Sequence, residues 1–256
     1  MVRGIHTAAA GMNGQQHALD VIANNLANVS TPGFKQDVPA FADLHVEVLR
    51  RYGPSNPRGV PIGSLGHGSG VDEVRTDLRA GAVISTRSNL DMALLGEGYF
   101  TVQTARGERY TRDGHFRVAQ VRQADGSTQT LLTDARGNPV LGENGPIEMA
   151  NRDQAQVQVR EDGTLLEGGK PFAKLLLRNA PTAALRKEGD NLLAIVGTPA
   201  VAAPRVQGGA LEQSNVNAVA SMVKMISVQR AYEAMQKAIV AQDETLGKVV
   251  NEVGRV

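Results

Sequence analysis

Residues 3–29, RGIHTAAAGMNGQQHALDVIANNLANV, carry the strongest periodicity in the chain. Large apolar residues recur here at every seventh position: Ile5, Met12, Leu19 and Leu26. A second series fills the alternate position of the same heptad, with one polar member: Ala8, Gln15, Ile22 and Val29. This spacing predicts an amphipathic helix with an apolar seam. We expect the helix to end near residues 30–33, because Pro32 disfavours helical backbone at the residue before it and Gly33 follows.

A matching pattern occupies residues 217–256 at the other end of the chain. One heptad position is filled by large residues: Met225, Tyr232, Ile239, Leu246 and Val253. The second position has one polar member: Val228, Met235, Gln242, Val249 and Val256. Three residues before the pattern are candidate N-caps: Ser214, Asn215 and Asn217. Charged residues lie off this seam: Lys224, Arg230, Glu233, Lys237 and Glu244. The sequence therefore predicts a second amphipathic helix.

The middle of the chain has short apolar runs that are separated by turn-forming pairs such as Asp162-Gly163 and Gly168-Gly169. The runs predict strands over residues 98–104, 115–121, 130–133, 155–160, 172–178 and 191–196. Many short strands with frequent turns favour an all-β domain. Residues 53–70, GPSNPRGVPIGSLGHGSG, are dense in Gly, Pro and Ser and predict an extended linker. This segment is either a solvated linker or a segment that becomes ordered only in a polymer, where it would fill gaps between neighbouring subunits and stiffen the assembly.

These patterns together predict an α+β protein in which the terminal helices pair as a discontinuous coiled-coil domain beside a central all-β domain. The expected boundaries are residues 1–35 and 211–256 for a helical polymerisation domain, 36–70 for an extended Gly/Pro-rich linker, and 71–210 for the β-rich domain. A short helix with a bare apolar seam is marginal in water. Each seam is therefore expected to be covered, by the other helix, by further subunits, or by both.

The terminal helices offer more apolar surface than one pairing covers. The first is rich in alanine, and the second carries another apolar strip: Val219, Met222, Val223 and Ile226. Such a surplus is what packing between subunits uses. Taken alone, a heptad stripe fits an ordinary core better than a polymer interface, so periodicity leaves both interpretations open.

The overall composition excludes several classes of protein. The chain has 256 residues, a formal net charge of +1 and no cysteine. We therefore expect no nucleic-acid partner, no disulfide and no thiol chemistry. No apolar run is long enough for a membrane span, and the first 29 residues lack the continuous apolar stretch of a cleaved leader.

Five motifs resemble those of one known family. The most specific is LDVIANNLANV at residues 19–29, followed by STPGFK at 30–35. The others are NLDMA at 89–93, GEGYFTV at 96–102, RYTRDGHF at 109–116, and LEQSNVN at 211–217 leading to MISVQRAYE at 225–233. Over nearly the whole chain this sequence resembles the bacterial flagellar rod and hook axial proteins. Residues 36–70 and 225–232 most resemble the distal rod type, and a proximal rod or hook-type subunit is the alternative.

The resemblance implies a structural subunit of the flagellar basal body that assembles into a helical filament of copies of itself. In that tube the terminal helices line the inside, and the tube transmits torque and carries the export channel. The implied partners are other rod and hook axial proteins, the flagellar type III export apparatus and the ring proteins around the rod. Export would cross the inner membrane without a cleaved signal peptide.

The assembly interface is expected to use the two seams and the asparagine cluster of the first motif. Asn24, Asn25 and Asn28 are expected to form hydrogen bonds across packed helices; on residue pattern alone a solvated helix face is the alternative. The predicted interface residues are Ile5, Met12, Leu19, Ile22, Asn24, Asn25, Leu26, Asn28, Met225, Val228, Tyr232, Met235, Ile239 and Leu246. Phe34 is expected to anchor the chain against a neighbour or its own core.

No catalytic pattern is evident in the sequence. The five histidines, among them His45 and His67, are dispersed without metal-ligand spacing. The segment GTLLEGGK at 163–170 has the wrong spacing for a phosphate-binding loop and predicts a hairpin. We therefore expect no enzyme activity, cofactor or metal. A secreted β-sandwich adhesin or carbohydrate-binding module is disfavoured by the absence of Trp, because sugar binding uses surface aromatic residues. A cell-wall hydrolase would need a carboxylate pair that the sequence does not reveal.

Overall fold

A computed structural model of the chain describes residues 2–43, 46–53, 56–66, 68–122, 128–150 and 153–253. His45, His67 and Val256, which entered the sequence analysis, lie outside the described residues, as do parts of the 36–70 segment. The chain forms two compact units. Unit 1 comprises Met1–Ala27, Asp37–Asp77 and Asn217–Val256, and unit 2 comprises Asn28–Gln36 and Leu78–Val216.

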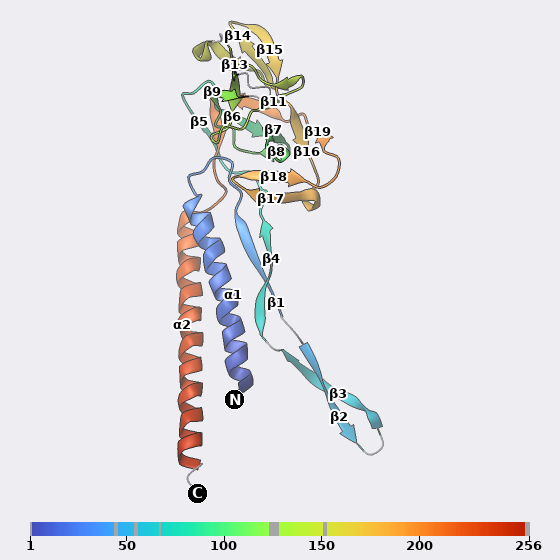
Figure 1. Ribbon diagram of the computed structural model, residues 1–256, viewed down its shortest axis with the longest axis vertical. Coiled ribbons are helices and arrows are strands. Elements are labelled where there is room, and N and C mark those ends of the chain that lie inside the picture. The colour runs from blue at the N-terminus through green and yellow to red at the C-terminus, as the bar shows by residue number, and fades with distance from the viewer. Residues whose placement is uncertain are drawn as a thin grey trace. The chain divides into compact units, whose positions relative to one another are not determined.

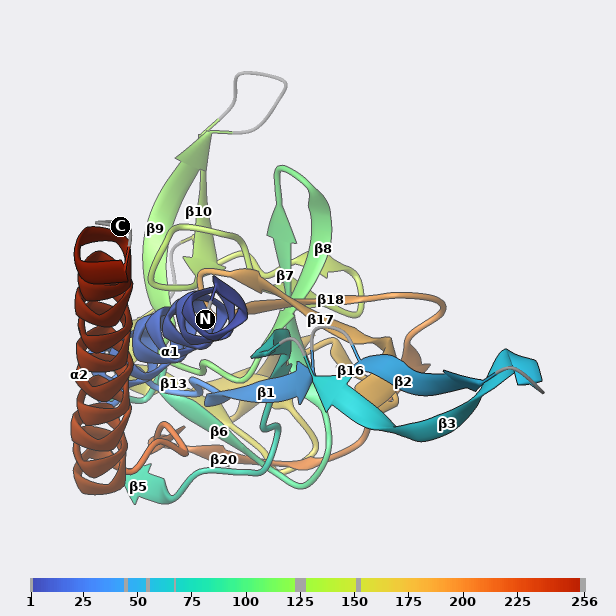
Figure 2. The same cartoon turned by 90° about the horizontal axis from the view of Figure 1, so that it is seen from below.

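Two long helices from opposite ends of the chain lie side by side in unit 1, α1 (Val2–Ala27) and α2 (Ala218–Lys248) (Figures 1 and 2). A short π-helical turn, Val249–Val253, extends α2. Asn217 is the N-cap of α2, because its side chain accepts a hydrogen bond from the Ala220 amide at 3.0 Å. Both predicted helices are confirmed. The first helix ends at Ala27, slightly before the predicted stop, and a turn follows in which the Thr31 amide donates to the Asn28 carbonyl.

The rest of unit 1 is built from two antiparallel strand pairs. Strand β1 (Asp37–Asp43) pairs with β4 (Ser69–Thr76), and β2 (Val46–Gly53) pairs with β3 (Asn56–Gly66). Strands therefore occupy much of the segment for which composition indicated an open linker. A two-stranded ribbon explains this difference, because its outer edges need no backbone donor and so tolerate proline. Val60 and Ile62 on either side of Pro61, and Tyr52 before the first of these prolines, also favour extended backbone.

The described residues of unit 2 form strands and two short 3-10 helices, Gln154–Gln156 and Thr182–Ala184. A six-stranded sheet has the order β17-β18-β8-β7-β16-β19. Its strands are β7 (Tyr99–Thr104), β8 (Gly107–Thr111), β16 (Leu177–Asn179), β17 (Leu185–Gly189), β18 (Leu192–Ile195) and β19 (Ala200–Val201). A three-stranded sheet has the order β13-β14-β15, formed by β13 (Val157–Val159), β14 (Thr164–Glu167) and β15 (Lys170–Lys174).

Four strand pairs complete unit 2. They join β5 (Val83–Ser85) to β21 (Ala210–Glu212), β6 (Met92–Leu95) to β20 (Arg205–Gly208), β9 (Arg117–Arg122) to β10 (Thr128–Thr133), and β11 (Leu141–Gly142) to β12 (Gly145–Pro146). Every window predicted as a strand contains one, and residues 172–178 contain parts of two, β15 and β16. The GTLLEGGK segment is the hairpin between β14 and β15, as predicted.

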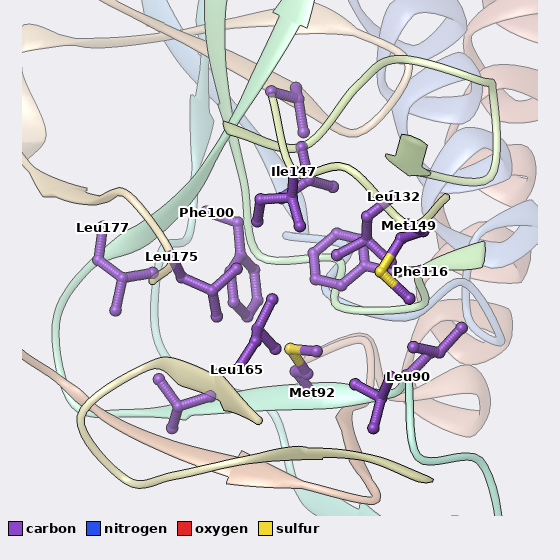
Figure 3. Packing of buried hydrophobic residues seen from close by; sticks show 14 of the residues in the cluster. Leu90, Met92, Phe100, Phe116, Leu132, Ile147, Met149, Leu165, Leu175 and Leu177 are labelled. Atoms are coloured by element: carbon purple, nitrogen blue, oxygen red, sulfur yellow. The ribbon is translucent and has the colours of Figure 1, made fainter. Parts of the chain in front are cut away.

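One apolar cluster forms the main core of unit 2 (Figure 3). Phe100 and Phe116 meet edge to face at its centre, with ring centroids 5.0 Å apart and an angle of 86° between the ring planes. The cluster also contains Met92, Leu132 and Leu165, which are fully or almost fully buried. Phe100 and Phe116 are thus used where burial stabilises most, whereas Phe41 and Tyr52 are exposed.

Candidate assembly interface

The two terminal helices pack antiparallel. A Cβ atom placed on Gly4 would lie 2.6 Å from Gln242 Nε2, and one placed on Gly11 would lie 2.8 Å from Met235 Sδ. The contact thus moves seven residues forward along α1 as it moves seven residues backward along α2. At these points the ends of the Gln242 and Met235 side chains lie against the backbone of α1, and a larger residue in place of either glycine would have to displace them. Unit 1 is therefore held together by the meeting of the two ends of the chain.

A line of small and buried positions on α1 marks this approach, and the sequence analysis missed it. Gly4 and Gly11 are followed at the same seven-residue spacing by Ala18 and Asn25, which are 1% and 2% exposed. The line lies directly beside the predicted series that begins at Ile5. Repeated glycine at heptad spacing was the signal that could have revealed it, since glycine in a helix interior costs about 1 kcal/mol against alanine.

The predicted seam residues lie on the less exposed side of each helix. On α1, Ile22 is buried and the others are half-buried: Ile5, Met12, Leu19 and Leu26. On α2 all the predicted seam residues are half-buried: Met225, Val228, Tyr232, Met235, Ile239 and Leu246. The five charged residues predicted to lie off the α2 seam are all exposed. Packing within the chain thus covers part of both seams, and their role between subunits stays a prediction.

The asparagine cluster has a different geometry from the expected one. Asn25 Nδ2 donates to the Asp37 carbonyl at 2.7 Å, and Asn25 Oδ1 accepts from the Asp37 amide at 2.9 Å. The side chain therefore forms the two hydrogen bonds that a neighbouring strand would form with the backbone amide and carbonyl of Asp37, the first residue of β1. We call this the substitute-strand role of Asn25. Asn28 Oδ1 accepts from the Thr31 hydroxyl at 3.1 Å, while the Asn24 side chain is exposed. Asn25 closes the base of the loop formed by residues 28–36.

Phe34, at the end of that loop, is 4% exposed and lies in unit 2. The ammonium of Lys187 lies 4.0 Å from the centre of its ring, a cation–π contact. Of the two anchoring sites expected for Phe34, the structure shows the chain's own core.

The outer side of α2 keeps a continuous apolar strip. Its members are 49–72% exposed: Val219, Met222, Val223 and Ile226. At about 100° per residue they point roughly opposite to the face that includes Val228 and Tyr232. Strands β2 and β3 are also apolar on the outside, with exposed Val48, Leu49, Tyr52, Val60 and Ile62. Unit 1 therefore presents two apolar surfaces that its own described residues do not cover.

The described part of the chain shows no cluster of His, Asp or Glu that could hold a metal ion. None of its helices combines the length and the apolar character that crossing a bilayer requires.

The two ends of the chain thus build one unit around a pair of helices, together with strands β1–β4, and most of the middle builds a β unit. Three family models match: "Flagella basal body rod protein" over residues 5–35, "Flagellar hook protein FlgE/F/G D1 domain" over 93–166, and "Flagellar basal body rod FlgEFG protein C-terminal" over 207–252. The chain belongs to the flagellar basal-body rod protein family, as its motifs indicated.

Full-length relatives support this assignment. The flagellar basal-body rod protein FlgG of Borreliella burgdorferi is 32% identical, with 100% of each chain covered. FlgG of Agrobacterium fabrum is 34% identical over 95% of this chain and 96% of its own. FlgF of Escherichia coli, also named a flagellar basal-body rod protein, is 32% identical over 97% of each chain. These relatives are structural proteins, so the prediction that the chain is no enzyme is confirmed.

Proposed function

We propose that this protein is a structural subunit of the flagellar basal-body rod and that its copies stack, with other rod and hook axial proteins, into a helical tube. Membership of the rod family supports the location and the structural role. One structural observation carries the assembly step. Helix α2 already packs on α1 through one face and still exposes Val219, Met222, Val223 and Ile226 on the other.

The energetics favour burial of that strip between subunits. Full burial of one large aliphatic side chain contributes roughly 1.5–3 kcal/mol. Since these side chains are about half exposed to begin with, a neighbouring helix would gain about 1 kcal/mol from each. Four such contacts per subunit, repeated along a tube, are enough to stabilise a polymer of marginal two-helix units. The seam residues would complete the interface where α1 and α2 leave them partly exposed.

The helix pair would form a discontinuous coiled coil in the assembled rod. The seven-residue spacing of the Gly4–Gln242 and Gly11–Met235 contacts supports this arrangement, because heptad repeats keep one seam facing the partner. In this proposal residues 1–35 and 211–256 build the polymerisation domain, residues 36–70 connect it, and residues 71–210 form the β domain. Asn24 and Asn28 would contact neighbouring helices, while Asn25 acts within the chain.

The tube would transmit torque and enclose the flagellar export channel, and ring proteins would surround it. The subunit would reach it through the flagellar type III export apparatus, without a cleaved signal peptide. The distal rod is the preferred position, since relatives named FlgG align over the full chain. A proximal position is the alternative, because a FlgF relative aligns with similar identity. The comparisons do not favour a β-sandwich adhesin.

The exposed side chains on β2 and β3 would pack against neighbouring subunits and stiffen the tube. Tyr52 and Ile62 are the most exposed of them, at 68% and 61%. Aromatic and β-branched side chains on a two-stranded ribbon are poorly stabilised without a further surface. Removal of residues 46–66 should therefore leave assembly possible and make the tube easier to bend.

Electron microscopy of the purified protein at high concentration tests the proposal. We expect tubes from the full-length chain, none from a version that lacks residues 1–35, and more strongly curved tubes from the version that lacks 46–66. The double variant Val223→Ser, Ile226→Ser should fold and fail to form tubes, because it removes apolar surface from the exposed strip. Lys224→Ser is the matched control on the same helix and should assemble. A double variant that assembles as well as this control would refute the role of the strip.

A further inference from the structure

Unit 2 contains a buried cluster of charged side chains that the assembly surfaces do not use. Glu212 is 1% exposed, and its Oε1 atom lies 2.5 Å from the Lys35 ammonium. Its Oε2 atom lies 3.4 Å from Nη1 of Arg112, which is 7% exposed. The Gly81 amide donates to Oε1 at 2.9 Å. One carboxylate thus accepts from two buried cations and one backbone amide.

The groups around Glu212 come from the segments that link unit 2 to unit 1. Residues 28–36 follow α1 and precede β1, residues 78–82 follow β4, and residues 213–216 precede α2. The Lys35 ammonium also donates to the Arg79 carbonyl at 2.8 Å. Residues 28–36 and 78–82 therefore each contribute a donor to this carboxylate, and Glu212 itself directly precedes residues 213–216.

Backbone bonds hold the same segments together. The Gly33 amide donates to the Glu212 carbonyl, and the Gln213 amide donates to the Ala82 carbonyl, each at 2.7 Å. Asn215 adds a side-chain link, because its Oδ1 atom accepts from the Gln36 amide at 2.8 Å and its Nδ2 atom donates to the Arg79 carbonyl at 3.1 Å. The three segments thus form one hydrogen-bonded junction.

The junction leaves no space for larger residues. Gly33 has φ of +65°, and a Cβ atom on it would collide with the backbone of Arg112. A Cβ atom on Gly81 would collide with the Gln213 carbonyl. Because the packing is this close, a shifted register would produce collisions. The segments are therefore either docked in the observed register or separated.

Removal of the carboxylate charge would act mainly on the junction. The buried charges of Lys35 and Arg112 would then face a neutral side chain in place of the carboxylate, which is less favourable than the intact pair. Glutamine cannot replace glutamate here, since its amide group would turn a donor toward other donors. The main apolar cluster around Phe100 contains none of these residues, so its packing does not depend on the charge.

We propose that Glu212 acts as a latch: its carboxylate holds the segments that lead to both terminal helices against the rest of unit 2. Loss of its charge then releases residues 28–36 while the core of unit 2 stays folded. The latch explains how segments from the two ends of the chain, 177 positions apart at Lys35 and Glu212, reach one defined register. It acts inside one chain and therefore does not depend on assembly.

Hydrogen exchange followed by mass spectrometry on the full-length protein tests the latch. In Glu212→Gln we expect exchange at residues 33–36 to become at least tenfold faster, while residues 99–104 and 128–133 keep their protection. Glu161→Gln is the matched control, because Glu161 forms an exposed ion pair with Arg205 at 2.8 Å in the same unit. This control should leave exchange at residues 33–36 unchanged.

Two milder variants keep the proposal testable if Glu212→Gln fails to fold. Asn215→Ala removes the bond to the Gln36 amide, and Lys35→Met removes one cation but leaves the Glu212–Arg112 pair. Both should speed exchange at residues 33–36 by a smaller factor than Glu212→Gln. The latch is refuted if both variants leave these residues fully protected, or if protection in 99–104 is lost in parallel with that in 33–36.

Discussion

The two units of this protein use their apolar residues in opposite ways. Both buried apolar clusters lie in unit 2, whereas the described buried apolar residues of unit 1 are only Ala18 and Ile22. Most of the exposed large apolar side chains belong to unit 1, on α2 and on strands β1–β4. Unit 2 is therefore stabilised by its own interior, whereas unit 1 leaves exposed the apolar side chains that the proposed assembly would cover.

The largest effect should separate the two units most clearly. Phe100 is fully buried in unit 2, whereas Phe41 on β1 is 47% exposed in unit 1. Truncation of a buried phenylalanine to alanine costs about 3–5 kcal/mol of unfolding free energy. We expect a loss of this size for Phe100→Ala and less than about 1 kcal/mol for Phe41→Ala. Urea denaturation measures both, and equal losses would contradict the proposed difference between the units.

A smaller effect should distinguish two neighbouring asparagines within unit 1. Asn25→Ala removes both bonds to the backbone of the half-buried Asp37, at a cost of about 0.5–1.5 kcal/mol for each bond. Asn24→Ala changes an exposed side chain and should cost less than about 0.5 kcal/mol. Exchange of the Asp37 amide is the local measurement. If both variants leave that amide equally protected, the substitute-strand role of Asn25 is wrong.

The sequence predicted what depends on neighbouring residues. Heptad spacing located both helices, and Asp162-Gly163 and Gly168-Gly169 located the turns on either side of β14. It did not predict features that depend on distant partners. The pairing of β1 with β4 joins residues up to 39 positions apart, Asp37 and Thr76, across Gly- and Pro-rich sequence. Likewise, no local pattern identifies Glu212 as the partner of Lys35, since an isolated glutamate before a helix normally indicates a solvated residue.

For the candidate interface, too, the sequence predicted the features that repeat along a helix and did not predict the contacts between distant residues. Periodicity placed the seam residues on the less exposed sides of α1 and α2, because a helix repeats its geometry along its length. Periodicity could not predict the Asn25–Asp37 hydrogen bonds, because they depend on where the chain returns after the loop formed by residues 28–36. The approach at Gly4 and Gly11 was visible in the spacing but requires the antiparallel partner for its meaning.

The smallest effect contrasts two aspartates in unit 2 that each precede a glycine. Burial raises the pKa of Asp113 above its ordinary value, and the Asp134 carboxylate adds to this rise, although the His115 amide opposes it. The folded state therefore takes up this proton at a higher pH than the unfolded state, so protonation stabilises the fold as pH falls through the raised pKa. The pKa of Asp162 is instead lowered, first by the Thr164 amide, so its contribution is lost as pH falls.

Asp113→Asn should remove the first of these dependences and Asp162→Asn the second. Relative to wild type, the free energy of unfolding of Asp113→Asn should therefore decrease between about pH 7 and pH 4, because only the wild type gains from protonation over this range. That of Asp162→Asn should increase relative to wild type only below about pH 4, because the lowered pKa of Asp162 keeps its carboxylate charged until then. Urea denaturation from about pH 7 down to about pH 2 measures both slopes. Slopes of the same sign would show that burial does not control the pKa of Asp113.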